Sequence, residues 1–412
     1  MEYVEIGSRT HRRAAVGMLL GSIVSFAILY SPQPLISLFS QEYGISPGTA
    51  GLSVAVTTMA LSVSLLFVSI LSNRWGRKMI MSLSLLSTSI LAIVSAFVHD
   101  FNWFLVIRFL EGISVAGFPS VAMAYLNEEF SPKSIGKIMG IYVAGTSIGG
   151  FVGRIVIGAL TDLLTWQFSL IILGGISLAC SLWFWRYLPA SRNFVHKKTT
   201  FAVWSREMLV NLRNRDLLRL FVIGFLLMGI YISVLDYIGY PLTRAPYNLS
   251  QTVFGFLFVV NLCGTYSSLL FGRLADRFPR PYVIGLAMAV FAAGVLLTLH
   301  HLLVLKILGV ALVAFGFFAA HSVASGWVGI LANREHKAHA SSCYLLFYYG
   351  GSSLIGWSGG AVLSHYNWNG LVYYLCALIA LVFLLAYRSN GASSVPGKPV
   401  HGSRKVAHAK TL

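Results

Sequence analysis

The chain has 412 residues, of which 57% are hydrophobic and 10% are charged, and its formal net charge is +17. A water-soluble protein carries about a quarter of its residues as charged side chains, so this composition excludes an ordinary soluble domain and indicates a chain that lies in a bilayer. The basic charge alone would suit a nucleic-acid-binding protein, but no polar segment is large enough to build a basic face with base-stacking aromatics.

Apolar stretches recur along nearly the whole chain, and each is long enough to cross a hydrocarbon core of roughly 30 Å. Because no water satisfies backbone groups there, these crossings must be helices. The sequence predicts twelve of them, at 16–38, 50–72, 79–98, 103–126, 137–160, 166–187, 219–241, 252–273, 282–299, 304–330, 341–363 and 369–387. We therefore predict an all-α membrane protein whose first span is an uncleaved helix and not a signal peptide.

The positive charges sort to one side of the predicted membrane. If the N-terminus is cytoplasmic, the two tails and the loops on its side hold 26 of the 30 Lys and Arg residues. Only Arg244 lies in an opposite loop and Lys306 at the edge of a span, while Arg108 and Arg154 fall inside spans. This asymmetry follows the positive-inside rule, so we expect a multi-pass plasma-membrane protein with both termini cytoplasmic.

The longest polar insert divides the spans six and six. Two pairs of segments resemble each other across it: SNRWGRK at 72–78 with ADRFPRP at 275–281, and AGTSIGGFVG at 144–153 with GGSSLIGWSG at 350–359. An even number of helices in each half gives parallel repeats, and hence two six-helix bundles related by a pseudo-two-fold axis along the membrane normal. The predicted parts are a bundle at 1–188, a cytoplasmic linker at 189–218, a second bundle at 219–388 and a cytoplasmic tail at 389–412.

Three motifs carry a resemblance to the major facilitator superfamily that covers nearly the whole chain. The loop at 72–78 is similar to the family's G-x-x-x-D-R-x-G-R-K, and RFLEG at 108–112 resembles its R-x-x-x-G. GTSIGG at 145–150 stands where the family's drug/proton antiporters carry G-P-x-x-G-G, with Thr146 at the proline position. The chain further resembles bacterial inner-membrane efflux-type permeases of the proton antiporter branch.

The resemblance implies that the basic loops take part in conformational change. In the family an aspartate of the first loop latches onto the start of helix 11; here Asn73 replaces it and can still accept a hydrogen bond, without the charge. The second copy keeps the aspartate, as Asp276, but has Pro279 in place of the glycine. The loop residues that we expect to act in this way are Asn73, Arg74, Gly76, Arg77, Asp276, Arg277 and Arg280.

Two acidic residues lie well inside spans, Glu111 and Asp236, and the resemblance places both spans beside a central cavity. An intramembrane carboxylate is costly unless it is paired or protonated, so both are candidates for proton coupling. Arg108 lies one helical turn from Glu111 and forms either a switchable pair with it or a fixed pair that only holds helices together. Asp236 is expected in the outer third of its helix, where water could reach it.

Other polar residues within spans are candidates for the proton path and the substrate cavity. His321 could relay protons or simply form a hydrogen bond. Arg154 could attract an anion, extend to the interface or pair with Asp236. In YSPQPL at 30–35 the prolines should kink the first helix and leave Gln33 available to a ligand or to another helix. The cavity candidates are Tyr30, Gln33, Arg154, Asn261 and Tyr348.

Glycines at four-residue spacing predict close helix packing, at Gly145, Gly149 and Gly153 and at Gly356 and Gly360. The chain has no phosphate-binding loop of the G-x-x-x-x-G-K-[ST] type and no metal or catalytic motif, so we expect neither an enzyme nor a bound cofactor or metal. We expect a monomeric, proton-coupled antiporter that exports a small organic compound. The alternative is a proton symporter or uptake permease for a sugar or organic anion.

Overall fold

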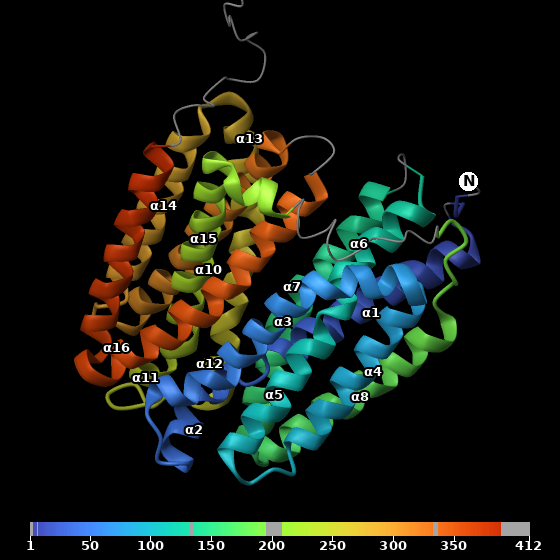
Figure 1. The fold of residues 1–412 in the computed structure, drawn as a ribbon. Helices are drawn as coiled ribbons and strands as arrows, with labels where there is room; N and C mark the ends of the chain where they lie inside the picture. The colour runs from blue at the N-terminus through green and yellow to red at the C-terminus, as the bar shows by residue number, and fades with distance from the viewer. Residues whose placement is uncertain (1–2, 6, 132–134, 195–207, 333–336, 389–412) are drawn as a thin grey trace, which may run out of the picture.

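All regular secondary structure is helical in the residues that the computed structural model describes, which are 3–5, 7–131, 135–194, 208–332 and 337–388. The helices form two bundles that lie side by side (Figure 1). The first bundle contains α1 (Arg9–Tyr30), η1 (Gln33–Leu35), α2 (Ile36–Glu42), α3 (Pro47–Trp75), α4 (Arg77–Ser95), α5 (Phe101–Val115), α6 (Gly117–Glu129), α7 (Ile135–Leu163) and α8 (Trp166–Tyr187). The second contains α10 (Arg215–Tyr237), α11 (Gly239–Leu242), α12 (Gln251–Leu257), η2 (Phe258–Leu262), α13 (Cys263–Arg277), α14 (Arg280–Leu297), α15 (Leu303–Leu331) and α16 (Lys337–Tyr387).

The described helices make twelve membrane crossings, as the sequence predicts. Eleven helical stretches are long and apolar enough to span a bilayer, and the last of them, His339–Tyr387, has 49 residues. Asn367 breaks that stretch with a φ of 57° and a ψ of −169°, so it crosses twice. Of the predicted linker and tail, residues 195–207 and 389–412 lie outside the described residues, and α10 begins four residues before the predicted start of its span, at Arg215.

The first crossing is interrupted where the prolines predict a kink. α1 ends at Tyr30, a single 3₁₀ turn follows, and the chain resumes as α2. Pro32 has no N–H and cannot donate to the carbonyl of Ile28, which instead accepts from the backbone N–H of Ser31 at 3.3 Å and from its hydroxyl at 2.9 Å. The seventh crossing has a matching interruption between α10 and α11, after Tyr237. With the offset of the two basic loops applied, the second break lies about one helical turn further along its crossing than the first.

The repeated basic loops lie at one end of the molecule, which we call the basic end; the N-terminus lies there too (Figure 1). Gly76 joins α3 to α4 with a φ of 90°, a conformation that favours glycine. Arg77 follows it and donates to Glu128 at 2.7 Å. In the second repeat Pro279 takes the glycine's place with a φ of −58°, and the helix restarts one residue later, at Arg280.

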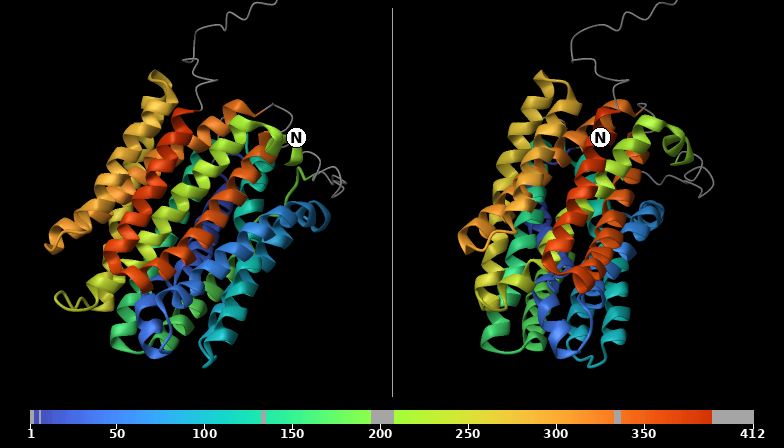
Figure 2. Two further views of the ribbon diagram at one scale, coloured as in Figure 1. Left: turned by 60° about the vertical axis from the view of Figure 1, so that its left-hand side comes forward. Right: turned by 90° about the vertical axis from the view of Figure 1, so that its left-hand side faces the viewer.

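The two bundles converge at the opposite end, which we call the closed end and where α2, α11 and α12 lie (Figure 1). They meet along two helix pairs, α3 with α16 and α7 with α12, and the first pair is seen from the side in Figure 2. Ser62 Oγ donates to the carbonyl of Leu346 at 2.9 Å, and Ser353 Oγ donates to that of Ala55. Contacts between the halves therefore run from the closed end to about the middle of α3.

One carboxylate of the first half caps a helix of the second half at the closed end. Asp162, near the end of α7, accepts hydrogen bonds from the backbone N–H groups of Gln251 and Thr252 at 3.0 and 2.7 Å. The Thr252 hydroxyl donates to it as well, at 2.6 Å. A carboxylate at a helix N-terminus satisfies unpaired N–H groups and interacts favourably with the helix dipole. Asp162 thus ties α12 to α7 across the two halves.

Glycines allow the closest helix contacts, although not always those expected from the spacing. A Cβ at Gly145, Gly149 or Gly153 would lie within 2.7 Å of α1 atoms, so this face packs α7 on α1 inside the first half. Gly360 lies against Gly48 of the first half. Gly356 has ordinary space around it, with its nearest neighbour 3.5 Å from a built Cβ.

We predict that Gly351→Ala destabilises the protein. A Cβ there would overlap the carbonyl of Phe225 in α10, and overpacking of this kind costs roughly 1–3 kcal/mol. Gly350 is the matched control, because its built Cβ would meet nothing closer than 3.9 Å. Thermal unfolding of the purified protein should occur several degrees lower for Gly351→Ala and no lower for Gly350→Ala. Equal unfolding temperatures for the two variants would contradict the packing of α16 on α10.

We also predict that Asp162→Ala lets the halves separate at the closed end. Loss of a helix cap costs about 0.5–2 kcal/mol, so the separated population should rise by about tenfold. Spin labels on Gln41 and Leu302, exposed residues of opposite halves at the closed end, report this as a longer distance.

The control for that experiment is Asp100→Ala. Asp100 also accepts from two backbone N–H groups, those of Asn102 and Trp103, but it caps α5 of its own half. Its removal should lower stability without lengthening the distance between labels. If both variants, or neither, lengthen that distance, Asp162 does not hold the halves together.

Candidate functional site

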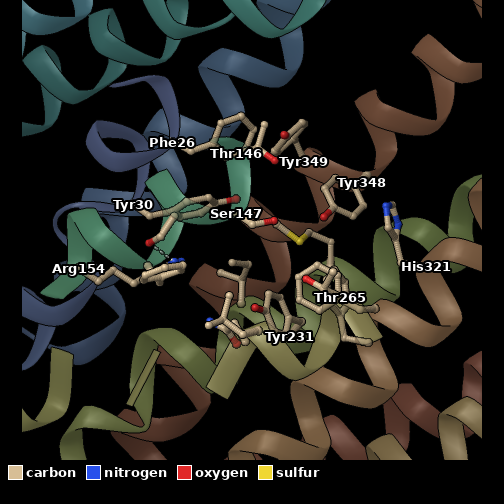
Figure 3. Close-up of a pocket in the computed structure, with 18 of the residues that line it drawn as sticks. Phe26, Tyr30, Thr146, Ser147, Arg154, Tyr231, Thr265, His321, Tyr348 and Tyr349 are labelled. Atoms are coloured by element: carbon tan, nitrogen blue, oxygen red, sulfur yellow. Dashed lines mark hydrogen bonds between the residues drawn. The ribbon is translucent and has the colours of Figure 1, made fainter. Parts of the chain in front are cut away.

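A cavity of about 280 Å³ lies between the two bundles, on the basic-end side of the contact between Gln33 and Asp236. Both halves line it with polar and aromatic side chains (Figure 3). The first half contributes Phe26, Tyr30, Thr146, Ser147 and Arg154, and the second contributes Tyr231, Thr265, His321, Tyr348 and Tyr349, among others. Of the residues that line it, Ser147 and Thr265 are exposed at the surface of the protein.

Aromatic rings form much of the wall that the second half contributes. Tyr231 of α10 stacks on Phe317 of α15, with ring centroids 4.0 Å apart and planes 4° from parallel. His321 lies one turn further along α15, 4.8 Å from the ring of Tyr348. Stacked rings hold each other's orientation, so this wall is flat and preformed.

Arg154 is the cation of this cavity, and its side chain is held from several directions. Its guanidinium carbon lies 4.6 Å from the ring centroid of Tyr30 and 4.7 Å from that of Phe258. Nε donates to the side-chain oxygen of Gln33, and one Nη donates to the carbonyl of Gly150. Only 5% of the residue is exposed. Cation–π contacts and hydrogen bonds together compensate for burying the charge.

Gln33 connects Arg154 to Asp236 of the other half. Its side-chain oxygen accepts from Arg154, and its Nε2 donates to Asp236 Oδ1. Gln33 and Asp236 are 203 residues apart, which is the offset between the two basic loops, so corresponding positions of the two repeats meet between the bundles. Gln33 lies in the 3₁₀ turn after the first break, and Asp236 lies in α10 just before the second. The result is a buried chain of three polar side chains that crosses from α7 to α10.

This arrangement corrects one expectation from the sequence and decides between two alternatives. Asp236 was expected where water could reach it, but the residue is 2% exposed because η1 and α16 cover it. Of the two alternatives for Gln33, a ligand or another helix, the structure shows the second: it is fully buried, and both ends of its amide bind side chains of other helices. Of the three alternatives for Arg154, the geometry is nearest to a pair with Asp236, formed through Gln33.

Arg108 and Glu111 lie inside the first half and do not line the cavity. The two side chains form an ion pair and are 1% and 0% exposed. Arg108 also donates to backbone carbonyls, to Ser53 at 2.9 Å, Leu29 at 2.8 Å and Ile28 at 3.3 Å. Ser31 also donates to the Ile28 carbonyl, with its N–H and its hydroxyl. Arg108 therefore adds hydrogen bonds at the end of the broken first helix, and Glu111 supplies the countercharge.

Of the remaining candidates, three line the cavity and the loop residues lie at the basic end. Tyr348 and His321 line it, and His321 Nδ1 lies 2.9 Å from the hydroxyl of Tyr344. Asn261 also lines it, from the 3₁₀ turn η2, and its buried Oδ1 has no hydrogen-bond partner among the described residues. The loop residues lie at the basic end, where Asp276 and Arg277 are exposed. The contact expected between Asn73 and the start of helix 11 borders residues 333–336, which lie outside the described residues.

Sequence reasoning missed several residues of the cavity. Tyr231, Tyr349 and Ser147 line it, and Phe258 lies against Arg154, but none was a candidate. Aromatic and small polar residues are common inside transmembrane helices and carry no signal of their own. The one available signal was position, because Tyr231 lies less than two turns from Asp236 and Ser147 two turns from Arg154.

Comparisons with known proteins all point to one family of membrane transporters. The model of the Major Facilitator Superfamily matches residues 18–264 and 237–410. The uncharacterised MFS-type transporter YybF of Bacillus subtilis is 42% identical over 391 residues, which cover 95% of this chain and 96% of YybF. The inner membrane transport protein YnfM of Escherichia coli is 37% identical over 391 residues, covering 94% and 93%.

A solved structure shares the fold. The crystal structure of a bacterial homologue of the human lysosomal transporter Spinster, in an inward-facing and occupied conformation, matches with a TM-score of 0.77. Its sequence is 15% identical, and the match covers 93% of this chain and 97% of that one.

Proposed function

The chain belongs to the major facilitator superfamily of membrane transporters, and from this premise we propose that it moves a small organic compound across the bacterial inner membrane by proton-coupled alternating access. In such a cycle two bundles rock about a central site, which opens to one side of the membrane at a time. The cavity between the halves is the substrate site in this proposal, and Asp236 is the proton site.

The observation that carries the proposal is the hydrogen-bonded series of side chains formed by Arg154, Gln33 and Asp236. It joins the two halves at the point where they must separate for the cavity to open at the closed end. An ionised Asp236 attracts Arg154 across Gln33 in a low-dielectric setting. A proton on Asp236 removes that attraction, so protonation and the separation of the halves are linked.

The positive-inside rule makes the basic end cytoplasmic, so the structure corresponds to a state that is closed towards the periplasm. The Asn73 loop lies at the cytoplasmic end, where we propose that it holds the halves together in the opposite state. Asn73 can serve as a hydrogen-bond acceptor there, although without charge.

We assign Arg108 and Glu111 to a supporting role, which is the fixed-pair alternative for these residues. Their hydrogen bonds stay within the first half and brace the break in α1. Because rocking moves the bundles as units, a pair inside one bundle keeps its partners through the cycle. Glu111 remains the second candidate for the proton site, since its Oε1 is buried without a hydrogen-bond partner among the described residues.

Two modes of coupling are compatible with a proton site at Asp236. Export in exchange for protons is the mode that the resemblance to efflux-type permeases favours, and it requires proton and compound to compete. Joint transport of proton and compound, the alternative, requires them to bind together. The cation in the cavity, Arg154, favours the second mode, because a bound anion would weaken the hold of Arg154 on the carboxylate of Asp236.

We predict that Asp236→Asn uncouples transport while Glu111→Gln does not. The substrate is first found as a compound that raises the unfolding temperature of the purified protein, from a library of anionic, neutral and cationic metabolites. Added outside proteoliposomes that contain a pH-sensitive dye, it should acidify the interior in joint transport and make it alkaline in exchange. In Asp236→Asn the pH change should fall below about a tenth of the wild-type rate, because an amide does not titrate near neutral pH.

The controls separate uncoupling from loss of transport. Protein-free liposomes correct for passive entry of the compound. Exchange of labelled for unlabelled compound, which needs no net proton movement, should persist in Asp236→Asn. If Asp236→Asn still moves protons and Glu111→Gln does not, the proton site is on α5. If both variants still move protons, His321 or another titratable group carries the coupling and the proposal is wrong.

A further inference from the structure

On the premise of the transport function above, we propose that the substrate is an aromatic organic acid, bound as its carboxylate. In this proposal the carboxylate replaces Asp236 as the anionic partner of Arg154, and the proton that enters with the substrate resides on Asp236. The proposal rests on the charge of the cavity, the geometry of Arg154, the aromatic wall and the surroundings of Asp236.

The charge of the cavity selects against cations. Among its described lining residues there is no carboxylate and no lysine; apart from tyrosines, the ionisable side chains are Arg154 and His321. Asp236, although close, lies behind Gln33 and does not line the cavity. An organic cation would therefore meet a like charge in a site of low dielectric, whereas an anion would meet an opposite one.

The guanidinium of Arg154 is held through two of its three nitrogens and has donors left on the third. Nε and one Nη are committed to Gln33 and Gly150, while the second Nη makes no hydrogen bond within the described part of the chain. The rings of Tyr30 and Phe258 hold the group in place. An arginine has five N–H donors in a planar fork, which matches the two oxygens of a carboxylate. A ligand carboxylate thus finds unused donors at an orientation that is already set.

The body of the ligand is indicated by the stacked wall on the opposite side. Tyr231, Phe317, His321 and Tyr348 form a series of near-parallel or tilted rings along α10, α15 and α16. These rings stack on one another, so a flat ligand ring meets their edges or the free face of the ring that ends the series, and aromatic pairs are favourable in both arrangements. The buried Oδ1 of Asn261, which lacks a donor among the described residues, suits a hydroxyl or N–H group on that ring. A small aliphatic acid would leave this wall unused.

Proton coupling follows from what surrounds Asp236. Its charged or titratable neighbours are Arg154 of α7, Tyr30 of α1 and Tyr237 of its own helix. Gln33 of η1 donates to it, and Gly356 of α16 packs against it without a charge. Tyrosine hydroxyls ordinarily titrate at about pH 10, so Asp236 is the neighbour that takes up a proton when a ligand anion neutralises Arg154.

The resulting rule is that Arg154 needs one negative partner for the closed end to shut. In the empty protein the partner is Asp236, so the empty, deprotonated protein can pass between the open and the shut state; in the loaded protein the partner is the ligand, with Asp236 protonated. A protonated protein without ligand has neither partner, so it cannot shut the open end and does not carry protons alone. Ligand and proton therefore bind together, which makes joint transport the mode of coupling.

The test compares trans-cinnamate with cinnamamide, cinnamylamine and acetate on the purified full-length protein, by isothermal titration near neutral pH. Cinnamate should bind at least about tenfold more tightly than each of the others, because only it offers both a carboxylate and a ring. Titration in buffers of different ionisation enthalpy should show uptake of about one proton per cinnamate, and close to none in Asp236→Asn.

Two arginine variants complete the design. Arg154→Gln should lower the affinity for cinnamate to that for the amide, whereas Arg244→Gln, which removes a cation stacked on Tyr240 outside the cavity, should leave it unchanged. The ligand comparison on the wild type decides the matter even if Arg154→Gln does not fold. If the amide or the amine binds as tightly as cinnamate, or if no proton is taken up, the inference is wrong. A further outcome separates this inference from the proposed function. If the substrate proves to be neutral, and its proton-coupled transport is lost in Asp236→Asn, the inference of an aromatic acid is wrong but the proposed function stands.

Discussion

The buried carboxylate of Asp236 is the constraint on which the rest of the structure depends. A charge in the interior of a transmembrane bundle is tolerated only with a partner, and for Asp236 that partner comes from the other half of the chain, through Gln33. The first crossing is interrupted just before Gln33, and the seventh is interrupted just after Asp236. The two halves also approach each other closely beside this contact, where Gly48 of the first half lies against Gly360 of the second. The cavity lies on the basic-end side of this contact and shares Arg154 with it.

The break in the first crossing has its own cost, which another buried pair compensates. Pro32 and Pro34 remove backbone donors, and Arg108 supplies three N–H groups to carbonyls of α1 and α3 in return. Glu111 balances the charge. These two buried ionic groups thus differ in kind: one is confined to a single bundle and stabilises it, whereas the other spans both bundles and can respond when they move.

Much of the fold could be predicted from the sequence, because hydrophobic length and the sorting of Lys and Arg are properties of single segments. The twelve crossings, the kink at Pro32 and the repeat are of this kind. The site was only partly predictable. Arg154, Gln33 and Asp236 each stood out as polar residues inside spans, yet their link joins residues 203 positions apart and depends on how the bundles meet. Spacing pointed to Gly356, whereas Gly351 makes the tight contact, because spacing does not reveal which face of a helix meets its neighbour.

The central claim is that the charge of Asp236 controls the closed end, and the most direct test is the distance across that end as a function of pH. An ionised Asp236 holds Arg154, so this contribution is present at higher pH and is lost as acidification protonates the carboxyl. With spin labels on Gln41 and Leu302, the wild-type distance should lengthen as the pH falls, and Asp236→Asn should show the longer distance at every pH. A wild-type distance that does not change with pH, or an unchanged pH response in Asp236→Asn, would contradict the account.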